Sequence, residues 1–384
     1  MNLTARFARR VTVVTVLTAA TGAAAAMPAT AQAAPVTQPR AAAAVPAKFK
    51  AGSLNWLSAS RGWLMGSAPC GKSTCTDVLA TTNGGTSWSL AGSIKTPIAT
   101  AAGSNTGVDE VRFATASVGW AYGPSLFRTA NGGRSWKAEP LPGNGHAVLA
   151  LAHSSTANYA VVSPCKEIGQ CTSKQLTLWR TSSLTSTSWT RIQLSLPFDP
   201  RAGLSAFGKT VYVVEPGEPG RLFASTDGRH FTARTSPCQV SQSVGLTQAA
   251  PTSATHVALL CDGNASISDA TKTVYRSVNT GKTDTSAGTT GAFGINAELA
   301  ASPSGNLLVD SWSNGSFMYL NDTHKSKWSM VLGLGDNGVG FNDLAFASTK
   351  VAWAVYGPVT LFSGDFGLLY VTRDGGQHWK LTRI

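Results

Sequence analysis

One phrase of eight residues occurs three times in the chain and limits what the chain can fold into. Residues 81–88 read TTNGGTSW, residues 129–136 read TANGGRSW and residues 372–379 read TRDGGQHW. Each copy lies between two short apolar runs, a pattern typical of two strands joined by a tight turn. The common form S/T-x-D/N-x-G-x-x-W therefore predicts a strand-to-strand turn that is closed by an aromatic side chain.

The residues of this phrase have separate roles in the predicted turn. The Asn or Asp accepts hydrogen bonds from backbone N–H groups two or three residues further on. The second Gly adopts a positive φ, and the Trp packs between neighbouring sheets. The predicted structural residues are Asn83, Gly85, Trp88, Asn131, Gly133, Trp136, Asp374, Gly376 and Trp379, with Asp227 and Asn279 in two degraded copies. Because the turn already uses these groups, we predict no catalytic role for them.

The closing aromatic position recurs at intervals of 42–53 residues. Its seven places are Trp88, Trp136, Trp189, Phe231, Asp284 (where the aromatic residue is absent), Trp328 and Trp379. An interval of this length accommodates one four-stranded propeller blade. No sustained helical periodicity follows the first 33 residues. We therefore predict an all-β fold, a seven-bladed β-propeller over residues 49–384.

A second pattern precedes the turn in the three clearest repeats. It is a short apolar run followed by a second run with a central Trp. The two runs are residues 54–56 and 61–65 in the first repeat, 111–113 and 118–122 in the second, and 344–346 and 351–355 in the last. We expect the first run to be the innermost strand of a blade and the Trp-bearing run to be the second. Face packing of the first and seventh blades is expected to close the ring, with a strand exchange through residues 47–50 as the alternative.

The N-terminal segment has the composition of an export signal. Three arginines in the first ten residues precede an apolar segment over residues 11–26 and an A-x-A cleavage site that ends at Ala33. The apolar segment is too short for a membrane span. We predict a secretion signal peptide (1–33), a flexible Ala/Pro-rich leader (34–48) and a secreted, extracellular propeller without stable membrane insertion.

The six cysteines form three couples that are close in sequence. An even number in an exported chain indicates disulfides, and six cysteines allow 15 pairings. Pairing of sequence neighbours fits the repeats, because two bridges then close loops within a blade and the third connects consecutive blades. These couples are Cys70 with Cys75, Cys165 with Cys171, and Cys238 with Cys261.

The charge and the motifs of the sequence do not indicate a nucleic acid, a metal or a cofactor as a partner. The formal net charge is +12, of which the three signal arginines contribute three, and charged residues are 13% of the chain. The chain has no dense basic run, no C-x-x-C spacing and no closely spaced His pair. Residues 66–73 (GSAPCGKS) match the P-loop pattern, but a strand and not a helix is expected after them, so the match is interpreted as chance.

The turn phrase and the Gly-Trp strand before it resemble those of the Asp-box propellers, whose repeat is also known as the bacterial neuraminidase (BNR, sialidase-like) repeat. The combination is most similar to the non-enzymatic photosystem II assembly factor-like propellers. The resemblance implies a propeller and, for that group, binding. Sialidases carry an arginine triad whose first Arg lies in an R-I-P phrase before the first Asp-box. No such phrase precedes residue 81, and residues 191–193 read RIQ.

Three acids are candidate catalytic residues. A glycosidase that uses two carboxylates needs them to face each other across a cleft. Glu110, Glu298 and Asp343 each lie at the start of a predicted inner strand, where they are either gathered around one mouth of the channel or separate and solvated. We predict a binding or scaffold propeller with a protein or cell-envelope glycan ligand, and the alternative is a glycoside hydrolase that acts through these acids.

Overall fold

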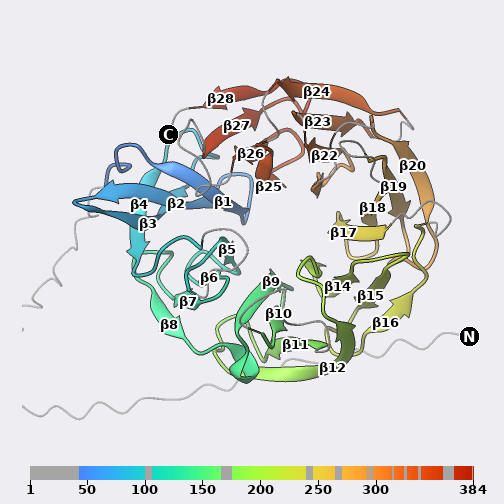
Figure 1. Cartoon of the computed structure of the whole chain (residues 1–384), viewed down its shortest axis with the longest axis horizontal. Coiled ribbons are helices and arrows are strands. Elements are labelled where there is room, and N and C mark those ends of the chain that lie inside the picture. Colours follow the sequence, from blue (N-terminus) through green and yellow to red (C-terminus); the bar gives the residue numbers. More distant parts are fainter. Residues whose placement is uncertain are drawn as a thin grey trace, which may run out of the picture. The chain divides into compact units, whose positions relative to one another are not determined.

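The computed structural model describes residues 43–99, 106–165, 175–238, 245–263, 270–291, 294, 297–313, 315–323, 327–335, 339–357, 367–382 and 384. These residues form seven antiparallel sheets of four strands each. Figure 1 shows the sheets arranged in a ring as the blades of a propeller. The prediction of an all-β, seven-bladed β-propeller is therefore confirmed.

Each blade uses four strands that are consecutive in sequence. Blade one contains β1 (Lys50–Trp56), β2 (Gly62–Cys70), β3 (Ser73–Thr81) and β4 (Ser89–Ile94). Blade two contains β5 (Glu110–Phe113), β6 (Gly119–Tyr122), β7 (Leu126–Thr129) and β8 (Lys137–Glu139), and a short 3-10 helix η1 (Pro142–Asn144) follows it. Blade three contains β9 (Ala147–His153), β10 (Asn158–Ser163), β11 (Gln175–Thr181) and β12 (Trp189–Pro197).

The remaining blades repeat this order. Blade four contains β13 (Gly203–Phe207), β14 (Thr210–Glu215), β15 (Arg221–Ser225) and β16 (Thr232–Arg234). Blade five contains β17 (Gly245–Pro251), β18 (Val257–Asp262), β19 (Lys272–Ser277) and β20 (Thr285–Thr289). Blade six contains β21 (Leu299–Ala301), β22 (Leu307–Trp312), β23 (Ser316–Asn321) and β24 (Ser329–Leu334). Blade seven contains β25 (Phe341–Phe346), β26 (Ala352–Tyr356), β27 (Leu368–Thr372) and β28 (Lys380–Thr382).

The first strand of each blade lies at the channel, as the sequence pattern predicts. β1 contacts β5 and β25, β13 contacts β9 and β17, and β21 contacts β17 and β25. The second strands carry Trp63, Trp120 and Trp353 and are almost entirely buried. A strand that is buried on both faces loses the apolar and polar alternation of an exposed sheet.

The hydrophobic core is divided among the interfaces between neighbouring blades. The closing aromatic residues lie in these interfaces, as predicted: Trp136 packs on the cluster that holds Trp63 of blade one, and the Trp189 ring of blade three is 5.5 Å from the Trp120 ring of blade two. Each such aromatic contact adds to the free energy gained by burying the apolar surface. Packing between neighbouring blades therefore contributes directly to stability.

The turn after the third strand is held by side-chain hydrogen bonds. The Thr81 hydroxyl donates to Asn83 Oδ1 (2.9 Å) and accepts from the Gly85 N–H (3.0 Å). Asn83 Oδ1 also accepts from the Ser87 N–H at 3.0 Å. The corresponding hydroxyl in three other turns makes the same two hydrogen bonds, and it belongs to Thr129, Ser277 and Thr372. The sequence pattern contained this hydroxyl, but its role was not predicted.

The predicted hydrogen-bond spacing within the turn needs correction. In the eight-residue turns the Asn or Asp accepts from N–H groups three or four residues further on, as Asp374 does from Gln377 and His378. Spacings of two and three occur in the fourth copy, where Asp227 accepts from Arg229 and His230. That copy is one residue shorter, so the same carboxylate reaches earlier N–H groups.

The second Gly of the turn is required for two reasons. Gly85, Gly133 and Gly376 have φ values of 76°, 93° and 105°, as predicted, and a side chain is disfavoured there. A Cβ atom on Gly85 would also lie 2.2 Å from the Trp353 ring of the preceding blade. This glycine therefore allows both the turn and the close approach of two blades.

Face packing between blades one and seven closes the ring. Leu54, Leu64 and Leu79 share an apolar cluster with Trp353 and Val355. Lys50 pairs with Ser67 of its own blade, and Ala43 pairs with Leu90 at the outer edge of that blade. Within the described part of the chain no strand passes between the two blades, so the alternative of a strand exchange through residues 47–50 is wrong.

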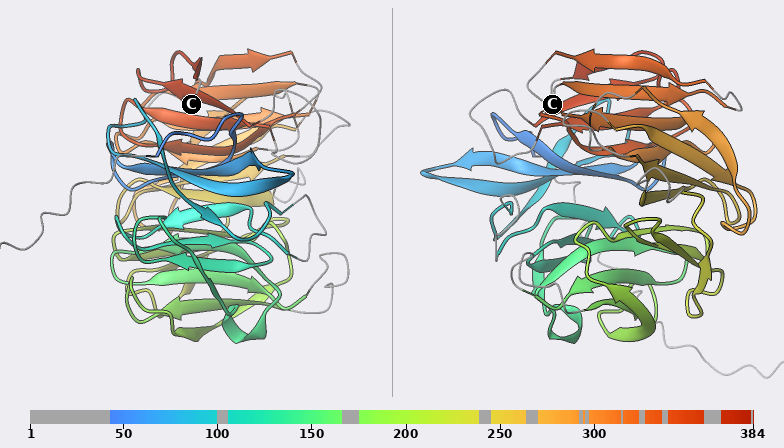
Figure 2. Two further views of the ribbon diagram at one scale, coloured as in Figure 1. Left: turned by 90° about the vertical axis from the view of Figure 1, so that its left-hand side faces the viewer. Right: turned by 45° about the vertical axis from the view of Figure 1, so that its right-hand side comes forward.

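Two of the three expected disulfides lie in the described residues. Cys70 and Cys75 (S–S 2.08 Å) join β2 to β3 in a hairpin that extends from blade one in the right-hand view of Figure 2. Residues 66–73, the P-loop match, lie in this hairpin, and a strand follows them. Cys238 and Cys261 connect the segment after β16 to β18. Cys171 and residues 1–42 lie outside the described residues, as do the predictions made for them.

The Cys238–Cys261 disulfide occupies the one blade interface whose closing aromatic position holds an acid. Both cysteines are buried in the apolar cluster between blades four and five, together with Leu222 and Leu259. Asp284 replaces the aromatic residue of blade five, and its Oδ1 atom is buried without a hydrogen-bond partner. The covalent link therefore lies in the interface that lacks a closing aromatic residue.

Candidate functional site

The central channel contains a cavity of about 610 Å³. Its lining includes residues from the first strands of blades two to seven and from the ends of several second strands. The first strands begin and the antiparallel second strands end at the same side of a blade, so the cavity lies at one mouth of the channel. None of the predicted turn residues lines it.

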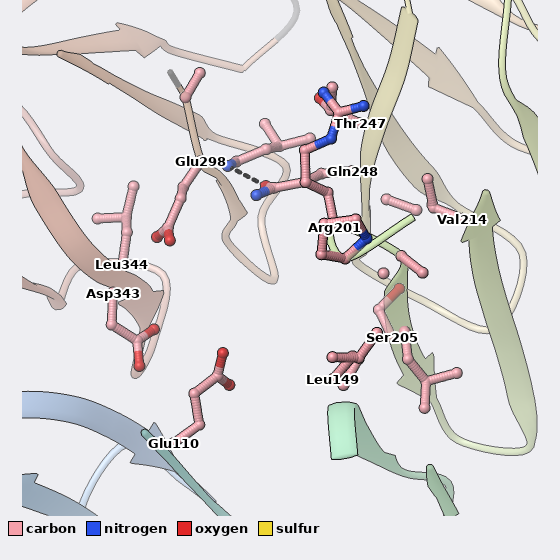
Figure 3. A pocket seen from close by; sticks show the side chains of 18 of the residues that line it. Glu110, Leu149, Arg201, Ser205, Val214, Thr247, Gln248, Glu298, Asp343 and Leu344 are labelled. Carbon is pink, nitrogen blue, oxygen red and sulfur yellow. Dashed lines mark hydrogen bonds between the residues drawn. The ribbon is translucent and has the colours of Figure 1, made fainter. Parts of the chain in front are cut away.

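The structure brings the three predicted acids together in this cavity. Glu110 is the first residue of β5, Glu298 directly precedes β21 and Asp343 is the third residue of β25. All three belong to the cavity lining. Figure 3 shows their carboxylates directed into the same space. These acids belong to blades two, six and seven. The three blades surround one channel only because the ring closes.

Arg112 holds two of these acids. Its guanidinium lies 2.8 Å from the Glu110 carboxylate and 3.5 Å from that of Asp343. Glu110 also accepts a hydrogen bond from the Tyr122 hydroxyl. Burial opposes the charge on Arg112, but Glu110, Tyr122 and Asp343 together outweigh burial and raise the pKa of Arg112 above its ordinary value. Glu110 and Asp343 are therefore fixed in position by a permanent cation.

Asp343 is also bound by the backbone of blade one. Its Oδ2 atom accepts from Ser53 Oγ at 3.0 Å and from the Leu54 N–H at 2.9 Å. Burial raises the pKa of Asp343, whereas Arg112 and these hydrogen bonds oppose the shift. One acid thus lines the cavity and connects the last blade to the first.

Glu298 has a different environment. Its backbone N–H donates to Asp310 Oδ1 at 2.8 Å, and Asp310 is completely buried. Burial, followed by the charges of Asp310 and Asp343, raises the pKa of Glu298 well above its usual range. Burial raises the pKa of Asp310 in the same way. Glu298 therefore keeps its proton to a higher pH than an exposed glutamate does.

A second charged group lies at the blade-five side of the cavity. Burial raises the pKa of Asp262 to about 6, although Lys272 and Arg201 oppose the shift. Lys272 is buried and donates to the backbone oxygens of Ala270 (2.7 Å) and Gly294. Arg201 is bound through two of its nitrogens to Asp199. The two basic residues are therefore already engaged.

The candidate acids were found from the sequence, but their partners were not. Arg112 and Glu110 alternate along one strand, so period-two alternation places them on the same face. That signal was available in the run of residues 110–113. Asp310 gives no comparable signal, because an acid in an apolar second strand has no local pattern that places it behind Glu298.

Neither a metal site nor a membrane span is found in the described residues. No group of three or more His, Cys, Asp or Glu within them is arranged to hold a metal ion. No helix in this part of the chain is long and apolar enough to cross a membrane.

Comparisons with known proteins give similar structures but no family. No family model matches the chain, and no curated protein matches it. Among solved structures, YCF48 bound to D1 peptide is 17% identical, covers 74% of this chain and 82% of its own, and has a TM-score of 0.47. YCF48 from Cyanidioschyzon merolae is 16% identical, covers 75% and 88%, and has a TM-score of 0.48. The Niastella koreensis GH74 enzyme is 12% identical, covers 87% and 72%, and has a TM-score of 0.31. The assignment of the fold rests on the seven sheets themselves.

Proposed function

We propose that the chain is a secreted binding or scaffold propeller whose ligand, a protein or a cell-envelope glycan, enters the cavity at the channel mouth. The cavity of about 610 Å³ at the hub, lined by six blades, is the observation that carries the proposal. Concave sites of this size with a few converging polar groups are the usual form of binding pockets. The signal peptide that the sequence predicts at residues 1–33 and the two disulfides of the described residues support export.

The fixed positions of the polar groups favour binding. Arg112 and blade one hold the Asp343 carboxylate, and Arg112 and Tyr122 hold that of Glu110. Acceptors that are ordered before a ligand arrives cost less entropy when the ligand binds. A pocket on rigid inner strands therefore presents its acceptors in one arrangement.

We also assign the chain to the Asp-box propellers. The turn of residues 81–88, with the Thr81 hydroxyl, the Asn83 amide oxygen and the Gly85 N–H joined by hydrogen bonds, supports this assignment. The turn is repeated with the same bonds at Thr129 and Thr372. None of its residues lines the cavity, which agrees with a structural role.

Binding is tested with protein that begins at Ala34, screened against peptide and bacterial glycan arrays. The variant Ser205→Trp fills the cavity, because Ser205 belongs to its lining. Ser329→Trp is the matched control on the exposed start of β24. We expect Ser205→Trp to weaken binding of the ligand by about tenfold or more, since the cavity no longer admits it. Equal binding by the two variants would refute the proposal.

A glycoside hydrolase is the second candidate. Three acids share one cavity, and burial with neighbouring charges raises the pKa of Glu298, as a general acid requires. Hydrolysis of sialosides and of plant and bacterial glycans is measured for the parent protein and for Glu298→Gln, Glu110→Gln and Asp343→Asn. Turnover that one of these substitutions abolishes would establish the hydrolase and replace the binding proposal.

Export is tested separately from binding. The chain is expressed with its first 33 residues in a bacterial host, and the N-terminus of the protein in the medium is sequenced. We expect Ala34 as the first residue, because the A-x-A site ends at Ala33. Retention of the uncleaved chain inside the cell would contradict secretion.

A further inference from the structure

The cavity at the channel mouth has two walls of different chemistry. One wall carries the carboxylates of Glu110, Glu298 and Asp343. The opposite wall carries the half-buried aliphatic side chains of Leu149 and Leu204, and Arg201 and Gln248 lie at its upper part. Figure 3 shows the acids on one side of the space and Leu149 on the other. A ligand that fits both walls is apolar along its length and charged at one end.

The acidic wall has more negative groups than positive ones. Arg112 is paired with Glu110 and Asp343, and Arg201 is paired with Asp199. Within the described residues, no donor forms a hydrogen bond or ion pair with the Glu298 carboxylate. Burying a carboxylate without a counter-charge is costly, so this position favours a cation from outside the chain.

Asp310 provides a second, independent indication. It is completely buried behind Glu298, and its Oδ1 atom accepts the Glu298 N–H. Its Oδ2 atom has no hydrogen-bond partner within the described part of the chain. A fully buried carboxylate oxygen without a donor is costly, and a positive charge that enters the neighbouring cavity lowers that cost. The Glu298 carboxylate and the Oδ2 atom of Asp310 therefore both lack a donor within the described residues.

We infer that the cavity binds the side chain of a Lys or Arg residue of a peptide partner. The cationic head lies among Glu298, Asp343 and Glu110, and the methylene stem lies on the wall formed by Leu149 and Leu204. Long basic side chains bury their stems against apolar surface while the charge meets polar groups. A sugar presents hydroxyl groups along its whole length and matches the aliphatic wall poorly. This inference rests on the proposed function and specifies its ligand.

Side-chain analogues test the inference directly. n-Butylammonium and n-propylguanidinium represent the Lys and Arg side chains, n-butanol is the neutral analogue and butyrate is the anionic one. Their dissociation constants are measured by NMR titration of the parent protein and of Ser205→Trp. We expect both cations to bind about tenfold or more tightly than butanol and butyrate, because only they offset the acidic wall. Ser205→Trp is expected to abolish this binding.

Charge variants and the source of the cation are tested next. Glu298→Gln and, independently, Glu110→Gln should weaken cation binding by about tenfold, and Glu139→Gln on the outer strand β8 should leave it unchanged. Thermal unfolding confirms that each variant is folded. The pentapeptide Gly-Gly-Lys-Gly-Gly, capped at both ends, should bind more tightly than its Gln counterpart and more tightly than glucosamine. Stronger binding of glucosamine would overturn the assignment to a peptide.

The failures of the two proposals are distinguishable. If a neutral or anionic analogue or array ligand binds as well as the cations and Ser205→Trp blocks it, the cavity is a binding site and only the cation inference is wrong. If the cations fail to bind, the inference is likewise wrong. If Ser205→Trp changes the binding of no analogue or array ligand, the cavity is not the binding site and the proposed function itself fails.

Discussion

Asp343 in blade seven accepts a hydrogen bond from the backbone N–H of Leu54 in blade one, at 2.9 Å, across 289 positions of sequence. The innermost strands of neighbouring blades do not pair with each other, so side chains satisfy some of their backbone donors. Gln248 serves the Leu299 N–H at 2.6 Å in the same way. The contact between Asp343 and Leu54 is thus part of ring closure as well as part of the cavity.

Asp343→Ala is expected to destabilise the protein by about 2–4 kcal/mol, because the Leu54 N–H and the Ser53 hydroxyl lose their acceptor and Arg112 loses a counter-charge. Asp343→Asn keeps an acceptor and should cost less. Chemical denaturation measures both, with Glu139→Ala as a control on the outer strand. Equal stability of Asp343→Ala and the parent would show that this contact does not help to close the ring.

Gly85→Ala should cost more stability than Gly71→Ala. Both glycines have positive φ (76° and 65°), which disfavours Ala by about 1 kcal/mol. A Cβ atom on Gly85 meets the Trp353 ring at 2.2 Å, whereas a Cβ atom on Gly71 meets nothing within 4 Å. The clash adds about 1–3 kcal/mol. Thermal unfolding of the two variants separates backbone strain from blade packing, and equal losses would mean that the interface absorbs the methyl group.

Removal of the Cys238–Cys261 disulfide should destabilise the protein more than removal of Cys70–Cys75. The bridges close loops with sequence separations of 23 and 5, worth about 3 and about 2 kcal/mol of chain entropy. The first bridge is also buried in a blade interface. The double Cys→Ala variants are compared by calorimetry under oxidising conditions. The reverse order of stability would contradict this role in the interface.

Asp284→Phe should increase stability by about 1 kcal/mol or more, because it removes a buried, unpaired carboxylate oxygen and restores the aromatic residue of the repeat. Burial already raises the pKa of Asp284, which indicates that its charge is unfavourable there. Calorimetry with and without the Cys238–Cys261 disulfide measures the effect. The gain should be present in both forms, and a loss of stability would show that this interface has adapted to the acid.

The stability difference between the parent and Glu298→Gln should depend on pH. Burial and the charges of Asp310, Asp343 and Glu110, partly offset by Arg112, raise the folded-state pKa of Glu298 above its ordinary value of 4.5. Protonated Glu298 is therefore favoured by folding, and this stabilisation is present below about pH 4.5 and lost as the pH rises through the folded-state pKa. The parent should lose stability relative to the Gln variant over that interval.

Comparison of thermal unfolding at several pH values between about pH 4.5 and pH 8 tests this dependence. The parent is compared with the Gln variant because His153 also makes stability depend on pH in this range. Burial lowers the pKa of His153 to about 4, so this residue favours folding at the higher pH values in both proteins, and its effect cancels in the difference. A difference that does not change with pH would show that Glu298 titrates normally.

The sequence determined the blades. Thr81, Asn83 and Gly85 act on one another within five positions, and the apolar runs of β1 and β2 pair across a short turn. Because these interactions join residues that are close in sequence, the recurring phrase and its closing aromatic position were enough to predict seven sheets. The three acids were also visible from the sequence, because each stands at the start of an inner strand.

Only the tertiary structure decided what those acids face. Glu110, Glu298 and Asp343 lie in three blades, and they share a cavity because ring closure brings the starts of the inner strands to one mouth. Arg112 reaches Asp343 across 231 positions, and no local pattern encodes such a contact. The turn of residues 372–379 repeats the local hydrogen bonds of the turn at residues 81–88. The charge around the channel depends instead on which blades become neighbours.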